Sequence, residues 1–145
     1  MMLNLIRGFT LVEALIIIIV LGIIASVVVP QFTSADTKDK LGDLKTNLRV
    51  IRDQLEVYKL QHFNHYPTGP DTFEDQMTKA SKADGTIADI GAARYDLGPY
   101  LLSVPHNPFT GTNSIGSGGI GTSAWYYDPQ TGQFRANHHE DSINY

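Results

Sequence analysis

The side chains best suited to metal chemistry in this sequence are four histidines and a neighbouring carboxylate: His62, His65, His138, His139 and Glu140. Imidazole nitrogens and carboxylate oxygens are ligands that zinc accepts. However, His62 and His65 stand at a predicted helix end, and the H-H-E run lies in a polar C-terminal tail. Neither spacing matches H-E-x-x-H or a comparable zinc motif, so we expect solvated histidines and no metal site here.

A second motif with chemical meaning is G-S-G-G-I-G at residues 116–121, which has the letters of a dinucleotide-binding fingerprint. That fingerprint works only between a strand and a helix whose N-terminus meets the pyrophosphate. Here the run precedes a predicted strand, so we expect a flexible glycine-rich loop and no cofactor. The sequence has no G-x-S-x-G motif, no P-loop and no cysteine, and we predict that the protein is not an enzyme.

The distribution of charge argues against a nucleic-acid partner and draws attention to Glu13. The net charge is −4 and no cluster of Lys and Arg occurs, so we expect no nucleic-acid partner. Between Glu13 and Asp36 the chain has 22 residues without a charge. A carboxylate therefore stands at the start of a segment that is otherwise suited to hydrocarbon.

Residues 9–29 are long enough to cross a bilayer core as a helix. From residue 14 to residue 29 the segment holds twelve Leu, Ile or Val residues. These contribute roughly −4 to −7 kcal/mol to insertion, whereas Glu13 opposes insertion by at most about 3 kcal/mol. The sequence therefore predicts a membrane helix. A cleaved signal peptide is disfavoured because the apolar run is long and reaches Pro30 without an A-x-A site, and a plain signal-anchor leaves Glu13 unexplained.

The stretch GFTLVEALIIIIVLGIIASVVVPQF resembles the N-terminal signature of type IV pilins and type II secretion pseudopilins. This resemblance implies that residues 1–8 are a leader, which a prepilin peptidase removes after Gly8, and that Phe9 is then N-methylated. It identifies Glu13 with the family's glutamate and Pro30 with the proline that kinks the helix. It also implies a single pass through the bacterial cytoplasmic (inner) membrane, with the leader cytoplasmic and the C-terminal domain periplasmic.

Glu13 is the residue for which the resemblance and the physical argument agree. An unpaired carboxylate in lipid is costly and favours a cationic partner. In pilin-like filaments that partner is the N-terminal amine of a neighbouring subunit, so we expect Phe9, Glu13 and Pro30 to act in subunit assembly. The alternatives are that Glu13 reaches the headgroups or pairs with the amine of its own Phe9.

Beyond Pro30 the pattern becomes that of an amphipathic helix. Apolar residues recur at three- and four-residue spacing and form one stripe: Leu41, Leu44, Leu48, Ile51, Leu55 and Tyr58. We expect residues 9–30 to form the transmembrane and assembly part of one helix that runs from about Phe9 to His62, and residues 31–66 to form its amphipathic part. The stripe is too short to require a coiled coil, so we expect it to pack on the rest of the chain.

The remaining chain is predicted to contain a short helix and a hairpin. Residues 67–123 are expected to be loops with a helix over residues 71–82, which a capping box of Asp71 and Glu74 would begin, and with at most one further helical turn. Residues 124–145 are expected to form a hairpin and tail, with Gly132 in the turn. Its predicted core residues are Trp125, Tyr127 and Phe134. The order of elements is similar to the α+β pilin fold, a long N-terminal helix packed on a small C-terminal antiparallel sheet.

Two stretches, YKLQHFNHYPT and GPYLLSVPHNPFTG, resemble the major pseudopilin of type II secretion, although Phe109 replaces its usual tryptophan. That subunit typically binds calcium in a loop of its small sheet, which requires several converging carboxylates. Between Pro99 and Trp125 this chain has no Asp or Glu. The remaining candidates are Asp128, Glu140 and Asp141, and they do not reproduce the family loop. We therefore leave calcium open and do not favour it.

The resemblance implies a structural subunit of a helical pseudopilus that helps to export folded proteins. Its partners would be further copies of itself, related minor pseudopilins, prepilin peptidase, a membrane platform protein and an assembly ATPase. The alternative is a type IV pilin for adhesion, twitching or DNA uptake, which the N-terminal motif does not separate from a pseudopilin. A third hypothesis is a membrane-anchored enzyme that uses the histidines.

Overall fold

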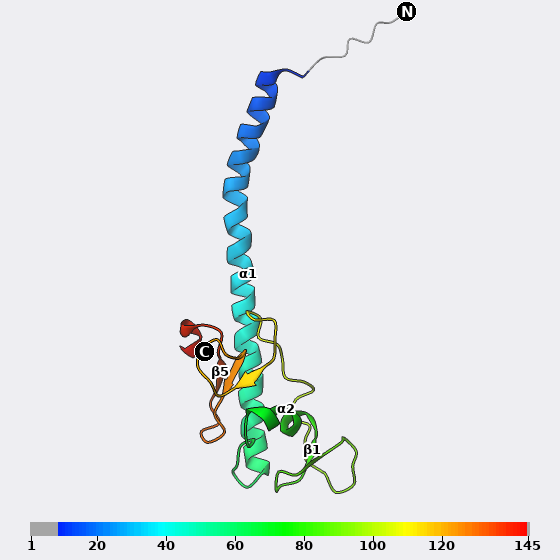
Figure 1. Cartoon of the computed structure of the whole chain (residues 1–145). Helices are drawn as coiled ribbons and strands as arrows, with labels where there is room; N and C mark the ends of the chain where they lie inside the picture. Colours follow the sequence, from blue (N-terminus) through cyan, green and yellow to red (C-terminus); the bar gives the residue numbers. More distant parts are fainter. Residues whose placement is uncertain (1–8, 145) are drawn as a thin grey trace, which may run out of the picture. The chain divides into compact units, whose positions relative to one another are not determined.

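Contacts between residues divide the chain into two compact units, Met1–Asp39 and Lys40–Tyr145. The structure is a computed structural model that describes residues 9–144, with the side chains of residues 25–35, 143 and 144 outside the description. Helix α1 (Leu11–Gln61) contributes residues to both units, and the other helices and strands of the described chain belong to the second (Figure 1). These bounds agree with the helix that the sequence predicts.

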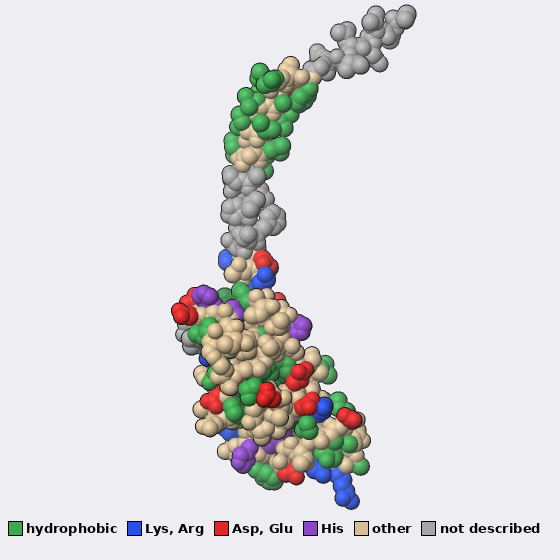
Figure 2. All heavy atoms as spheres, viewed as in Figure 1, with side chains coloured by type: hydrophobic (Ala, Val, Ile, Leu, Met, Phe, Trp, Pro, Cys, Tyr) green, Lys and Arg blue, Asp and Glu red, His purple; other side chains and the backbone are tan. Residues whose placement is uncertain are grey.

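In the N-terminal unit, α1 begins beside a threonine and exposes apolar side chains. The backbone N–H of Glu13 donates to Thr10 Oγ1 at 3.2 Å, as an N-terminal capping residue provides. From Leu11 to Ile24 the large apolar side chains are exposed at fractions from 43% for Ile17 to 85% for Leu11 (Figure 2). Such consecutive positions cover the whole circumference of a helix.

The membrane segment predicted over residues 9–30 extends into residues 25–30, whose side chains lie outside the described ones. In the described part of the chain, no helix is both long enough and apolar enough to span a bilayer.

In the C-terminal unit, α1 buries one face against the residues that follow it. Five positions of the predicted stripe are at most 2% exposed: Leu44, Leu48, Ile51, Leu55 and Tyr58. Leu41 is partly buried against the same cluster. The predicted stripe is therefore confirmed, and it packs on the small domain formed by the rest of the chain.

Helix α2 (Pro70–Thr78) begins without the predicted capping box. Its N-cap is Gly69, which makes no side-chain cap, and Asp71 lies in the first turn. The prediction was wrong because Pro70 takes the first helical position, where its fixed φ and missing N–H are favourable. The helix buries Phe73, Gln76 and Met77.

The segment after α2 forms a small hairpin, where the sequence had predicted more helix. Strand β1 (Ala80–Ser81) pairs with β2 (Ile87–Ala88) in antiparallel register, with Ala80 opposite Ala88. Asp84 Oδ1 accepts from the backbone N–H of Thr86 at 3.0 Å and from its hydroxyl at 2.7 Å, which holds the turn. The chain reverses there, so the residues after Thr78 pair with β2 instead of continuing the helix. No helix lies between β2 and β3 in the described chain.

A three-stranded sheet, ordered β3-β4-β5, completes the C-terminal unit. Strands β4 (Trp125–Tyr127) and β5 (Phe134–Ala136) form the predicted antiparallel hairpin, and Gly132 in its turn has φ 72°. Strand β3 (Ile115–Gly116) pairs with β4 in parallel, so the prediction of a purely antiparallel sheet was wrong. The reason is that the glycine-rich segment after β3 loops back and returns the chain in the same direction.

The core of the C-terminal unit is aromatic. The ring of Phe73 lies 4.7 Å from that of Tyr127 and 5.3 Å from that of Phe134, measured between centroids. Trp125 is fully buried and donates from Nε1 to the carbonyl of Pro105 at 2.9 Å. The three predicted core residues of the hairpin are confirmed, and the α+β class is confirmed with them. A short 3-10 helix, η1 (Glu140–Asn144), follows β5.

Candidate assembly surface and ion-binding residues

The predicted assembly residues lie at the start of α1. Glu13 is in the first helical turn with its side chain exposed, and Phe9 is exposed just before the helix begins. A carboxylate in the first turn is favoured by the positive end of the helix dipole. Gly8 lies outside the described residues, and Pro30 lies within α1 with its side chain outside them. The roles of these four residues in processing and assembly stay predictions.

The helical surface that follows Glu13 has an unusual composition for exposed protein. Between Leu15 and Leu21 every position carries Leu, Ile or Val, and each of them is exposed. A helix that is apolar all round is ordinarily buried, either in protein or in lipid. The N-terminal unit therefore presents a surface that requires an apolar environment outside its own chain. We refer to the exposed apolar residues between Leu11 and Ile24 as the apolar surface.

The calcium candidates lie in two different elements. Asp128 uses both carboxylate oxygens in the hairpin turn: Oδ1 accepts from the N–H of Gln130 at 2.9 Å, and Oδ2 accepts from the hydroxyl of Thr131 at 2.7 Å. These bonds, the Thr131 hydroxyl first, hold the pKa of Asp128 below its ordinary value. Glu140 and Asp141 begin η1. Among the residues that the structure describes, no group of three or more His, Cys, Asp or Glu side chains could hold a metal ion.

His62 was predicted to be solvated, and this prediction was wrong. The side chain is buried, and its ring stacks on Tyr58 at a centroid distance of 3.7 Å. Nδ1 lies 2.8 Å from the carbonyl of Tyr58, and Nε2 lies 3.1 Å from Ser81 Oγ. Because a carbonyl only accepts, Nδ1 carries the proton and Nε2 accepts from the serine. The prediction failed because His62 contacts Ser81 in β1, which is 19 residues away in the sequence.

His138 is half-buried and belongs to a local network. Its ring stacks on Phe109 at 4.7 Å, and Asn107 Nδ2 donates to its Nδ1 at 3.2 Å. Burial, followed by the nearby His139, lowers the pKa of His138 below its ordinary value. Phe109, which stands where the resemblance would place tryptophan, therefore covers a histidine.

The glycine-rich run leaves β3 as the predicted loop, and the next element is strand β4, where a dinucleotide-binding fingerprint would require a helix. Buried Asn137 ties the loop to the end of β5: its Nδ2 donates to the carbonyl of Gly119 at 2.9 Å, and its own carbonyl accepts from the N–H of Gly121. A second buried asparagine, Asn107, donates to the carbonyl of Ala124 at 2.8 Å. Sequence reasoning missed both asparagines, and their only signal was a polar residue next to a turn.

Comparison with known proteins finds relatives that share one name, type II secretion system core protein G. The relative from Klebsiella pneumoniae is 30% identical over 103 residues, which are 71% of this chain and 69% of the relative. The chain belongs to the family of type II secretion system core protein G. Relatives of the same name from Klebsiella michiganensis and Vibrio cholerae are 29% identical over 113 and 102 residues, which are 78% and 70% of this chain and 75% and 64% of those proteins. No protein-family model and no solved structure matches the chain.

Membership of the type II secretion system core protein G family confirms the pseudopilin resemblance that the N-terminal signature indicated. The match covers 71% of the chain in the first of these relatives, and the quoted signature accounts for only part of it. The resemblance therefore extends into the C-terminal unit, where the core and the hairpin lie.

Proposed function

We propose that this protein is a structural subunit of the pseudopilus of a bacterial type II secretion system and polymerises through its N-terminal helix. The observation that carries the proposal is the 30% identity, over 71% of this chain, with a relative named type II secretion system core protein G. The proposed role is structural, and no catalytic step is assigned to the chain.

The division of the molecule supports this role. The C-terminal unit buries its own apolar side chains around Phe73, Trp125 and Phe134, as an independently folded head does. The apolar surface of the N-terminal unit is left for lipid or for the helices of other copies. In a filament, Glu13 would pair with the Phe9 amine of a neighbouring subunit, which neutralises a carboxylate that is costly in hydrocarbon.

The proposal includes the finer features that the resemblance implies. These are the pilin fold, a leader over residues 1–8 that prepilin peptidase removes, N-methylation of Phe9, and a single pass through the inner membrane with the head periplasmic. The proposed partners are further copies of the chain, minor pseudopilins, the membrane platform protein and the assembly ATPase. Calcium is not part of the proposal.

The test replaces Glu13 in a bacterium whose own core subunit has been deleted. We expect Glu13→Ala to insert normally but to reduce sheared filaments, seen by electron microscopy, and secretion of the system's substrates by at least about tenfold, because an ion pair in a low-dielectric surrounding is lost. Glu74→Ala is the matched control, since Glu74 is an exposed glutamate of α2.

Two results would contradict the proposal. One is normal filament formation by Glu13→Ala, and the other is mature protein that still begins at Met1 without a methyl group. Long surface filaments that support twitching or adhesion, with secretion unchanged after deletion of the gene, would favour a type IV pilin instead.

A further inference from the structure

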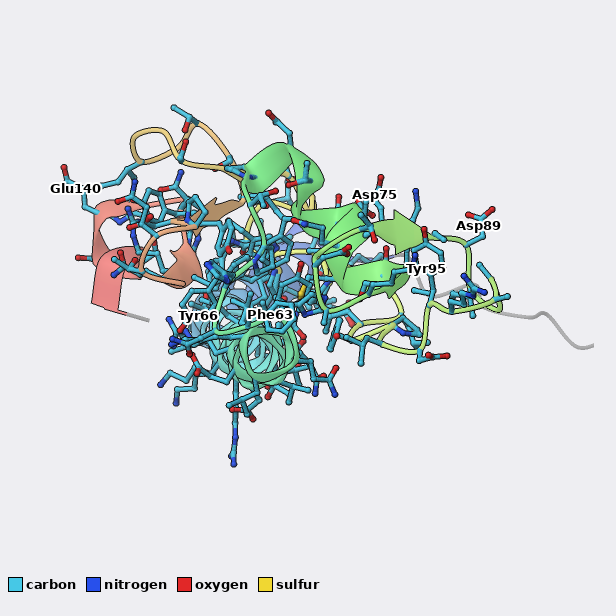
Figure 3. All side chains as sticks on the ribbon, turned by 90° about the horizontal axis from the view of Figure 1, so that it is seen from below. Phe63, Tyr66, Asp75, Asp89, Tyr95 and Glu140 are labelled. Carbon is cyan, nitrogen blue, oxygen red and sulfur yellow. The ribbon has the colours of Figure 1, made fainter. Side chains whose placement is uncertain are left out.

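A cavity of about 630 Å³ opens at the C-terminal end of α1, within the C-terminal unit. It is bordered by the end of α1 and the turn after it, by α2, by the β1–β2 turn and by the β4–β5 turn. Figure 3 looks onto this end of α1 and shows Phe63 and Tyr66 there, and both line the cavity. Its size lies in the range of protein cavities that hold small ligands or single side chains of a partner.

Two buried residues direct hydrogen-bonding atoms into this cavity without using them in the fold. Tyr58 is 2% exposed and Gln76 is 6% exposed, and both line the cavity. Gln76 Oε1 accepts from the N–H of Thr68 at 2.8 Å, but within the described chain neither the Gln76 amide nitrogen nor the Tyr58 hydroxyl has a hydrogen-bond partner. Every fully enclosed side-chain N or O atom in the described chain has a partner, so these two atoms must reach the cavity surface.

The Gln76 amide nitrogen and the Tyr58 hydroxyl both lie close to Gly85. A methyl group built on Gly85 would lie 3.9 Å from Gln76 Nε2 and 3.9 Å from the Tyr58 hydroxyl. They therefore lie at most about twice that distance apart, on either side of the space above the Gly85 backbone. Two hydrogen-bonding atoms that converge on one open space without a protein partner are available to a ligand.

The rim of the cavity carries an aromatic ring that the fold does not use. Phe63 lies two residues after the end of α1 in the left-handed region, with φ 53°, and the residue is 72% exposed. Glycine is the usual residue at such a position, and a bulky residue there is strained. The backbone N–H of Asn64 donates to the carbonyl of Lys59 at 3.0 Å, so this conformation ends the helix, and the exposed ring is left available to a ligand.

The charged residues that line the cavity limit the charge that a ligand can carry. No Lys or Arg is among the described residues that line the cavity, whereas Asp84 is. The hydroxyl and the N–H of Thr86 hold the pKa of Asp84 below its ordinary value, so this side chain is a carboxylate at neutral pH. A ligand carboxylate would meet this charge inside the cavity, whereas Lys82, which also lowers the pKa of Asp84, and Lys59, which donates to the Tyr66 hydroxyl at 3.2 Å, lie outside its lining. A neutral acceptor suits the Gln76 amide nitrogen, which can only donate.

We infer that this cavity binds a neutral amide, such as a peptide group, whose carbonyl accepts from the Tyr58 hydroxyl and the Gln76 amide and whose apolar substituent packs against Phe63 and Tyr66. Nothing in this inference depends on filament assembly, because the cavity lies entirely in the C-terminal unit.

The test is an NMR titration of the full chain in detergent micelles with N-acetyl-L-phenylalaninamide, a neutral amide that also has a phenyl ring. We expect saturable shifts of the Gln76 and Gly85 backbone signals. N-acetyl-L-phenylalanine, which differs by its carboxylate, should bind at least about fivefold more weakly because of Asp84. Absence of saturable shifts with the amide, or equal affinity for the two compounds, would overturn the inference.

Two pairs of variants separate binding from folding. Tyr58→Phe removes only the hydroxyl and should weaken amide binding by about 2- to 10-fold, whereas Tyr126→Phe, whose residue does not line the cavity, should leave it unchanged. Phe63→Gly should raise the midpoint of thermal unfolding and weaken binding. Asn64→Gly is its control, because Asn64 also has a positive φ, 67°, but does not line the cavity. Unchanged amide affinity in Tyr58→Phe or in Phe63→Gly would contradict the proposed contacts.

Discussion

Large apolar side chains of α1 are buried along one stripe in the C-terminal unit of the molecule and exposed in the N-terminal unit. In the C-terminal unit, Leu48 and Ile51 are at most 2% exposed, whereas in the N-terminal unit Leu15 and Ile18 are 47% and 62% exposed. The side chains are of the same kind, but their pattern differs. In the C-terminal unit apolar residues alternate with charges at helical spacing, so one face packs within the chain. In the N-terminal unit no charge occurs between Glu13 and Asp36, so these apolar side chains surround the helix and the burial they require has to come from other molecules.

The largest expected effect comes from a matched pair of leucine truncations. Leu48→Ala should lower the free energy of unfolding of the C-terminal unit by about 2 to 5 kcal/mol, because it leaves a cavity in the core. Leu15→Ala should change it by less than about 0.5 kcal/mol, because that side chain is exposed. The single tryptophan, Trp125, is fully buried in this unit, so its fluorescence during urea denaturation measures both variants. Equal effects of the two substitutions on the free energy of unfolding would contradict the difference in burial between Leu48 and Leu15.

A smaller effect is expected for tyrosine hydroxyls within the C-terminal unit. Tyr127 is fully buried and donates to the carbonyl of Pro67 at 2.7 Å, so Tyr127→Phe should cost about 1 to 2 kcal/mol of unfolding free energy. Tyr58→Phe should change it by less than about 0.5 kcal/mol, since its hydroxyl faces the cavity. The same denaturation experiment measures both. A large loss in Tyr58→Phe would show that its hydroxyl serves the fold and not a ligand.

The smallest effect is a pH dependence that belongs to the C-terminal unit alone. The pKa of His138 is lowered from its ordinary value of 6.5, so the unfolded chain takes up this proton at a higher pH than the folded chain does. The contribution of His138 to stability is therefore complete above about pH 6.5 and decreases as the pH falls toward the lowered pKa. Between pH 7 and pH 5, His138→Gln should lose less stability than the wild type.

The control for this measurement is His106→Gln, since the side chain of His106 is exposed. It should lose as much stability as the wild type over the same interval. The five histidines of the sequence all follow residue 61, so the apolar surface has none. If His138→Gln loses as much stability between pH 7 and pH 5 as the wild type does, groups other than His138 cause the pH dependence.

The parts of the fold that could be predicted are those with a repeated pattern. The extent of α1, its buried stripe and the β4–β5 hairpin were visible because spacing and turn residues recur over several positions. Strands β1, β2 and β3 have two residues each, which is too short for any alternation to appear. Their existence depends on pairing with residues elsewhere in the chain.

The sites were predictable to different degrees for the same reason. The family could be recognised from one continuous stretch, in which Gly8, Phe9, Glu13 and Pro30 stand at fixed separations. The burial of His62 could not be predicted, because its partner Ser81 is 19 residues away in a strand without a sequence signal. The cavity was missed because the polar atoms that define it come from α1 and α2, and only folding brings them together.

The outer edge of the three-stranded sheet is closed by the protein's own side chains. Arg52 Nε, from α1, donates to the carbonyl of Phe134 at 2.9 Å, and Figure 1 shows β5 beside α1. Ser142 Oγ, from η1, covers the carbonyl of Ala136 at 3.3 Å and shares its one proton between that carbonyl and the carbonyl of His139. Phe134 and Ala136 belong to β5, which is an edge strand. An open edge can template the addition of foreign strands and start cross-β aggregation. In the proposed pseudopilus, where many copies would lie together, these side chains would oppose amyloid-like growth from β5.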